Sequence, residues 1–153
     1  MQIKNKIILY FFIIFFSSNL ILKADEFNIS AKEITFDKNN NVVTGKGQVE
    51  VTDKDGKIIK SDKVIYQKEN EFLTVEGNVE LFDTLGNILK TNKATYDKKN
   101  ELVITFGESD LKLKNGYMLQ GKNITYNTAE EILASSEASI LSDNEGNIVK
   151  TTM

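Results

Sequence analysis

The sequence predicts an all-β protein, an antiparallel sandwich, roll or solenoid built from 30-residue repeats of two strands each. Three observations predict this fold. From residue 31 the chain divides into four blocks of 30 residues without a gap. Within the blocks, apolar and polar residues alternate with a period of two, as in half-buried strands. A glycine recurs once per block where a turn is expected.

Matching columns of residues define the repeat. The aromatic column contains Phe36, Tyr66, Tyr96 and Tyr126. The turn glycines are Gly56, Gly86, Gly116 and Gly146. A second glycine column contains Gly47, Gly77 and Gly107, and Glu137 replaces it in the last block. Because this second glycine falls inside a strand, it predicts a bulge or bend.

The chain begins with the layout of a signal peptide. The basic segment MQIKNK precedes the apolar run IILYFFIIFF, and SSNLILKA leads to the acidic segment DEF. We expect residues 1–24 to be removed after Ala24, although Leu22 stands where a small residue is preferred. The alternative is an uncleaved membrane anchor, but residues 7–22 are shorter than the roughly 20 apolar residues that span a bilayer. Both interpretations place the body outside the cytoplasm.

The body, residues 25–153, is predicted to form one β-roll domain. The expected strands are 31–37, 42–52, 57–66, 71–82, 87–96, 101–113, 117–126 and 131–141. In the second block the inward residues are expected to be Ile58, Val64 and Tyr66 on one strand and Leu73, Val75, Val79 and Leu81 on the next. Helical spacing is absent from residues 27–153.

Both ends of the predicted sheet carry edge strands without proline, near residues 27–36 and 132–149. An unprotected edge invites pairing with a strand of another chain. Residues 151–153 begin a fifth block in phase with Thr91. We therefore expect either a fragment or a last strand that a partner completes.

Composition excludes several classes of function. The chain has no Cys and no His, which removes ordinary zinc, haem and iron–sulfur sites and the most common catalytic base. All 19 basic residues are Lys. After residue 24 there remain 16 Lys and 22 acidic residues, a net charge of −6, which disfavours a nucleic-acid partner. We expect neither a cofactor nor enzymatic activity.

Four polar segments receive structural interpretations. The acids of Asp53–Gly56 and Ser142–Gly146 suggest calcium, but a full calcium loop needs many more oxygen ligands at set spacing, so both segments are predicted to be turns. Glu130 and Glu131 resemble a glycosidase pair, but neighbours in a strand point to opposite faces. Residues 97–100 (DKKN) are predicted to be a solvated turn, with a lipid-phosphate contact as the alternative.

The export signal and the tandem units SDKVIY, LTVEGNVEL and DTLGNILK resemble the organic-solvent-tolerance (OstA) family. This family includes LptA, LptC and the periplasmic N-terminal domain of LptD. The most telling stretches are residues 34–51 and 64–81, and the resemblance covers residues 27–153. It implies a β-jellyroll open along one side, whose apolar lumen shields the lipid A acyl chains of lipopolysaccharide. It also implies that such domains join by edge-strand pairing to bridge the periplasm to the outer membrane.

The predicted groove-lining residues point inward at matching phases of successive repeats: Ile34, Phe36, Val49, Val51, Val64, Tyr66, Val79, Leu81, Tyr96, Leu111 and Tyr126. The resemblance leaves open an LptA-like protein, the N-terminal domain of an LptD-like protein and a membrane-anchored LptC-like subunit. The other alternative is a structural repeat with a sealed core, such as a surface fibre or stalk.

Overall fold

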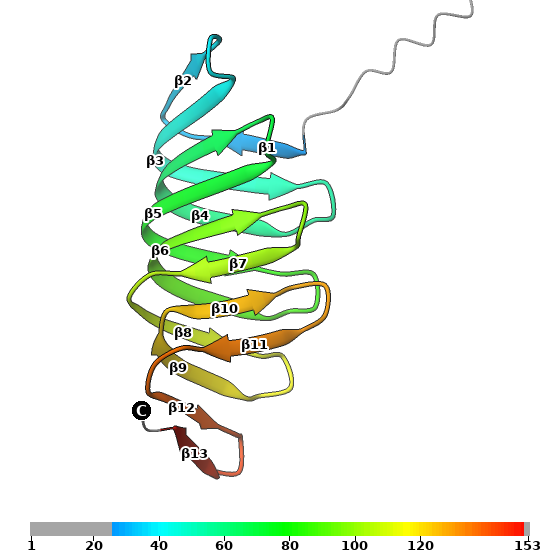
Figure 1. Cartoon of the computed structure of the whole chain (residues 1–153), viewed down its shortest axis with the longest axis vertical. Helices are drawn as coiled ribbons and strands as arrows, with labels where there is room; N and C mark the ends of the chain where they lie inside the picture. The colour runs from blue at the N-terminus through cyan, green and yellow to red at the C-terminus, as the bar shows by residue number, and fades with distance from the viewer. Residues whose placement is uncertain (1–25, 152–153) are drawn as a thin grey trace, which may run out of the picture.

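The structure, a computed structural model, describes residues 26–151 as an all-β protein, which confirms the predicted fold (Figure 1). The strands are β1 (Phe27–Ser30), β2 (Glu33–Asp37), β3 (Val42–Asp53), β4 (Ile58–Gln67), β5 (Phe72–Phe82), β6 (Ile88–Asp97), β7 (Leu102–Thr105), β8 (Glu108–Lys112), β9 (Met118–Lys122), β10 (Ile124–Asn127), β11 (Ile132–Ser135), β12 (Ser139–Ser142) and β13 (Ile148–Thr151). The predicted signal peptide lies outside the described residues. Between residues 26 and 151 there is no helix able to cross a bilayer.

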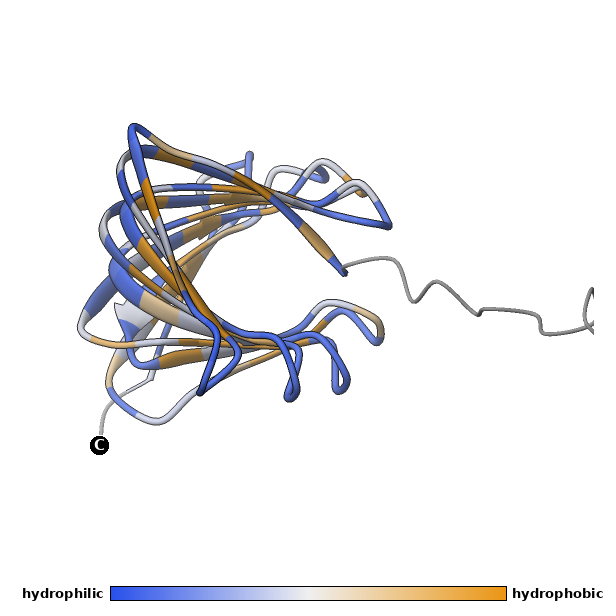
Figure 2. Ribbon diagram, turned by 90° about the horizontal axis from the view of Figure 1, so that it is seen from above, coloured by the Kyte–Doolittle hydropathy of each residue, from blue (hydrophilic) through white to orange (hydrophobic). Residues whose placement is uncertain are grey.

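All strands belong to one antiparallel sheet, whose main path runs β1-β3-β4-β5-β6-β8-β9-β12-β13. The remaining strands pair beside this path: β2 with β3, β7 with β6 and β10, and β11 with β10. Seen end-on, the sheet curls into two facing arms joined along one side (Figure 2). Arm A comprises residues 33–46, 63–76, 93–105 and 124–135. Arm B comprises residues 27–30, 49–61, 79–91, 108–122 and 139–151.

The chain passes from one arm to the other at a bulge. Register shifts separate Lys46 from Val49 and Glu76 from Val79, and the intervening Gly47 and Gly77 have φ angles of 75° and 79°. A left-handed backbone conformation of this kind favours glycine. The predicted role of the second glycine column as a bend is therefore confirmed in these two strands.

This bend explains where the predicted strands differ from the observed ones. The expected strands 101–113, 117–126 and 131–141 are each interrupted at the bend, giving β7 and β8, β9 and β10, and β11 and β12. Within β4 the register also shifts between Lys60 and Lys63, which changes the inward phase of that strand. Ile58 was expected to point inward, but Ile59 is the buried residue of the pair, with 2% of its surface exposed.

Each arm presents one continuous row of directly paired apolar residues to the interior. The arm A row contains Phe36, Val43, Tyr66, Leu73, Tyr96, Val103, Tyr126 and Leu133. The arm B row contains Ile29, Val51, Ile59, Leu81, Leu89, Leu111, Leu119, Leu141 and Val149. The middle of both rows forms the core, because antiparallel pairing at a constant phase stacks side chains on one face.

We expect Gly77→Ala to destabilise the protein more than Gly107→Ala. Both glycines have positive φ, so both substitutions incur about 1–2 kcal/mol of backbone strain. A Cβ atom on Gly77 would also lie 2.8 Å from the Cβ of Asp62, whereas a Cβ on Gly107 meets nothing within 4 Å. Urea unfolding of both variants measures the difference, and equal losses of stability would contradict the crowded bend.

Candidate functional site

The structure brings most of the predicted groove residues together in the core. Val49, Val51, Val64, Tyr66, Val79, Leu81, Tyr96, Leu111 and Tyr126 are all at most 3% exposed. Ile34 and Phe36 lie on β2 at the N-terminal end and are 54% and 46% exposed. The predicted groove residues therefore form one surface, whose middle is buried in the core and whose N-terminal end, at Ile34 and Phe36, is exposed.

A pocket of about 240 Å³ lies at this N-terminal end, and Phe27, Ile29, Ile34, Val43, Tyr66 and Lys68 contribute to its lining. The ring of Phe27 packs edge-on against Tyr66, with 4.9 Å between the ring centroids. In the turn after β4, the Lys68 Nζ lies 5.6 Å from the centre of the Phe36 ring. Apolar side chains of the inner rows therefore line this pocket together with the polar side chains of Asn28 and Lys68.

On the side of the roll opposite the bends, each arm ends in a row of turns. The two rows of turns face each other, and we call the boundary between them the seam. Side chains bridge the seam in its middle. The hydroxyl of Tyr96 lies 3.2 Å from Asp53 Oδ2 and 2.8 Å from Glu101 Oε2. We call this cluster the clasp, and its charged members are Asp53, Asp55 and Lys57 on arm B and Lys98 and Glu101 on arm A.

The ion pairs of the clasp cross the seam in both directions. Lys57 Nζ on arm B lies 2.8 Å from Glu101 Oε2 on arm A. Lys98 Nζ on arm A lies 3.3 Å from Asp53 Oδ2 on arm B and also pairs with Asp55 and Glu101. The Lys98 and Asp53 side chains are only 4% and 1% exposed. Lys98 was predicted to lie in a solvated turn; this prediction was wrong, because acids from the opposite arm cover it.

One repeat further along the chain, a second bridge crosses the seam without an ion pair. The Tyr126 hydroxyl donates to Asp83 Oδ2 at 2.6 Å, and the Asn87 side-chain amide donates to the Tyr126 hydroxyl at 2.9 Å. Tyr126 and Asp83 are 43 residues apart, the same separation as Tyr96 and Asp53. The repeat therefore generates successive bridges as well as successive strands.

The electrostatics of the clasp favour the charged forms of its ion pairs. Burial raises the pKa of Glu101, but hydrogen bonds from Lys57, Lys98, Thr128 and Tyr96 outweigh it and hold the pKa at about 2. Burial lowers the pKa of Lys98, yet Asp55 and Glu101 raise it above its ordinary value. Burial and then Glu101 raise the pKa of Tyr96, so its hydroxyl stays a proton donor.

Sequence reasoning did not identify the clasp. Asp53 is the last residue of β3 and opens the turn that was predicted at Asp53–Gly56, since Gly56 N donates to Asp53 O. Its Oδ1 accepts the backbone amides of Asp55 and Lys57, both at 2.9 Å. The available signal was the common separation of 43 residues that joins Asp53 to Tyr96 and Asp83 to Tyr126. Using this signal requires knowing by how much the two arms are offset.

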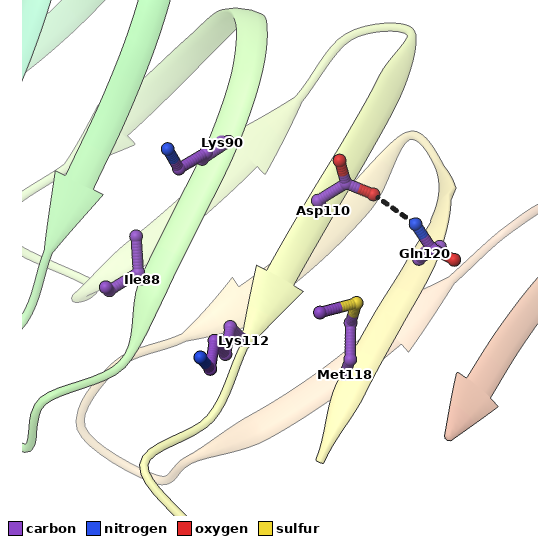
Figure 3. A pocket seen from close by; sticks show the side chains of 6 residues that line it. All are labelled: Ile88, Lys90, Asp110, Lys112, Met118 and Gln120. Carbon is purple, nitrogen blue, oxygen red and sulfur yellow. Dashed lines mark hydrogen bonds between the residues drawn. The ribbon is translucent and has the colours of Figure 1, made fainter. Parts of the chain in front are cut away.

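A separate pocket of about 430 Å³ lies on the outer face of arm B (Figure 3). Its lining residues are Ile88, Lys90, Asp110, Lys112, Met118 and Gln120. These residues alternate with the inward Leu89, Leu111 and Leu119 of the same strands. The sheet therefore separates this outer pocket from the interior.

The depressed pKa of Glu101 predicts a loss of stability in acid. A carboxylate whose pKa is lowered on folding contributes stability above its usual value of 4.5, and this contribution disappears as the pH falls toward about 2. We expect the difference in unfolding free energy between wild type and Glu101→Gln to shrink across that window. The control is Glu50→Gln, since Glu50 pairs with Lys60 on the exposed outer face at 3.6 Å. A pH-independent difference for Glu101→Gln would contradict the assignment.

Comparison with solved structures identifies a similar fold. LptH from Pseudomonas aeruginosa, described as the LptA-homologous periplasmic component of the lipopolysaccharide transport device, superposes with a TM-score of 0.64. The two sequences are 16% identical, and the match covers 84% of this chain and 98% of LptH. At this level of identity the likeness concerns the fold.

Comparison of the sequences gives a family assignment. No curated protein matches this sequence. Residues 13–148 match the family described as OstA-like protein, which includes nearly all of the roll and both seam bridges. The chain belongs to the OstA-like protein family.

Proposed function

We propose that this protein is a periplasmic component of lipopolysaccharide transport that shields lipid A acyl chains between its two arms and helps to bridge to the outer membrane. The observation that carries the proposal is the pair of facing apolar rows that run the length of the roll. Both rows end in exposed residues, Phe36 at 46% and Val149 at 61%. An acyl chain gains about 0.8 kcal/mol for each CH₂ group that it buries.

Two further findings support the proposal. Family membership and the likeness to LptH agree with a transport role. We propose binding and transfer of lipid without catalysis, after export directed by residues 1–24. The proposal covers an LptA-like protein and the N-terminal domain of an LptD-like protein, with an anchored LptC-like subunit as the alternative.

We also propose that the roll joins other rolls of its kind end to end. Among the strands of residues 26–151, β1 and β2 at the N-terminal end each pair only with β3, and β13 at the C-terminal end pairs only with β12. The 43-residue offset between the arms leaves arm A projecting at one end and arm B at the other (Figure 1). The exposed inner residues Phe36 and Val149 therefore belong to opposite arms. In an end-to-end contact, the projecting arm A of one roll would cover the projecting arm B of the next.

A structural repeat with a sealed core remains the second candidate. Tight burial of the middle of both rows favours it, since Leu89, Leu111 and Val103 have no exposed surface. The clasp above them also favours a closed interior. The two candidates differ in whether lipid reaches the inner rows.

Photocrosslinking distinguishes the two candidates. A photoreactive residue at Phe36 or Val149, on the inner rows, should capture lipopolysaccharide mixed with the purified protein. The matched controls are Thr35 and Lys150, which are exposed neighbours in the same strands and point to the outer face. We expect adducts mainly at the inner positions, and equal capture on both faces would favour the sealed repeat.

Assembly should depend on the inner face of the C-terminal edge. Val149 and Ile148 are 61% and 58% exposed on opposite faces of β13. We expect the purified protein to form concentration-dependent multimers, and Val149→Asp to weaken them more than Ile148→Asp because a covered charge is costly. Multi-angle light scattering measures this. A strict monomer at all concentrations, or equal effects of both variants, would contradict the end-to-end arrangement.

A further inference from the structure

We propose that the seam is a side gate, held shut by the clasp, through which an acyl chain reaches the interior between the two arms. This inference rests on the proposed lipid-binding function and adds the route of access. It follows from how the seam is closed, from what lies beneath it and from where its bridges end.

Side chains alone hold the seam closed in the described part of the chain. The backbone hydrogen bonds of the turns stay within one arm, as when Lys98 N donates to Glu71 O on arm A or Lys54 N donates to Glu26 O on arm B. Within residues 26–151, the bridges across the seam include the ion pairs of the clasp, the contacts of the Tyr96 and Tyr126 hydroxyls, and the edge-on packing of the Phe27 ring against Tyr66 and Tyr96. The arms can therefore separate at the seam while every strand keeps its partners.

The closed seam covers an interior that side chains already fill. Tyr96 and Tyr126, which reach up to the seam, are each 1% exposed and belong to the arm A row. Leu89 and Leu111 in the arm B row are fully buried. An acyl chain can contact these residues only if the arms move apart, and the joined side of the roll is held by continuous strands that bend between the arms.

The chemistry of the clasp suits reversible opening. Desolvation offsets part of the attraction between the buried charges of the clasp, and all of its partners return to water when the arms separate. Apolar side chains at the same positions would oppose opening, because separation of the arms would expose them to water. Asp55 already lies half in water, with 51% of its side chain exposed, so water reaches the clasp from the outside.

The bridges stop part of the way along the seam. The next turn on arm B has Leu113 where the two bridged turns have Asp53 and Asp83. A pocket of about 370 Å³ lies there, and Asn87, Leu113 and Glu131 are among its lining residues. The seam therefore passes from an ion-paired segment, through a bridge that has hydrogen bonds but no ion pair, to a segment with neither, which is where separation of the arms would begin.

Locking the seam tests the proposal. The chain has no native Cys, so Asp55→Cys with Lys99→Cys places one thiol on each arm at the clasp. Because Asp55 is itself a partner of Lys98, the rate with the lock closed is compared with the rate of the same variant after the lock is released. A short bismaleimide with an internal disulfide joins them and is released by reductant. The matched control is Glu69→Cys with Lys99→Cys, which links two turns of arm A, since Lys99 Nζ donates to Glu69 O at 2.9 Å. The probe is cis-parinaric acid, whose fluorescence rises in an apolar site, followed by stopped-flow mixing.

We expect the lock across the seam to slow association of the probe by roughly tenfold or more, with recovery after reduction, and the lock within arm A to leave the rate nearly unchanged. Conversely, Tyr96→Phe combined with Glu101→Gln should accelerate association, whereas Glu80→Gln, which breaks the exposed pair with Lys90, should not. Binding at equal rates in both locked forms would overturn the gate while leaving the lipid-binding proposal standing. No binding by the unmodified chain would overturn both.

Discussion

Antiparallel pairing at a constant 30-residue period is the constraint on which the rest of this roll depends. Because each block repeats the phase of the one before, Val51 and Leu81 face inward in one row with Leu111, while Tyr66, Tyr96 and Tyr126 do so in the other. The bend near the second glycine column then turns one sheet into two arms whose apolar rows face each other. The core, the seam and the two uncovered ends are all consequences of this register.

The same register explains why polar groups are buried at the seam. A roll closed by apolar contacts along both sides would be a sealed barrel, and one left open would expose its core. Here Asp53 and Lys98 are buried together, and the hydroxyl of Tyr96 joins them from the core side. The buried ion pairs fix which groups of the two arms meet, and the clasp therefore sets the alignment of the arms.

Much of the fold could be predicted from the sequence, because periodicity determines strand identity and phase. Val64, Tyr66, Val79 and Leu81 were predicted to face the interior, and all four are buried. The prediction failed for Ile58, since a register shift in β4 depends on the partner strand, and pairing is a tertiary property. The clasp could not be predicted for the same reason. Lys98 in a polar DKKN segment resembles any solvated turn until the opposite arm is placed over it.

Methyl NMR shows whether an acyl chain contacts the inner rows of the roll. Protein with labelled methyl groups is mixed with lipopolysaccharide, and nuclear Overhauser effects from acyl-chain protons are recorded. Leu89 and Ile88 are adjacent in β6, but Leu89 is fully buried on the inner face and Ile88 lines the outer pocket. The account predicts effects at Leu89 and Leu111 and none at Ile88 and Met118. Effects confined to Ile88 and Met118 would contradict it and would place the lipid on the outer face.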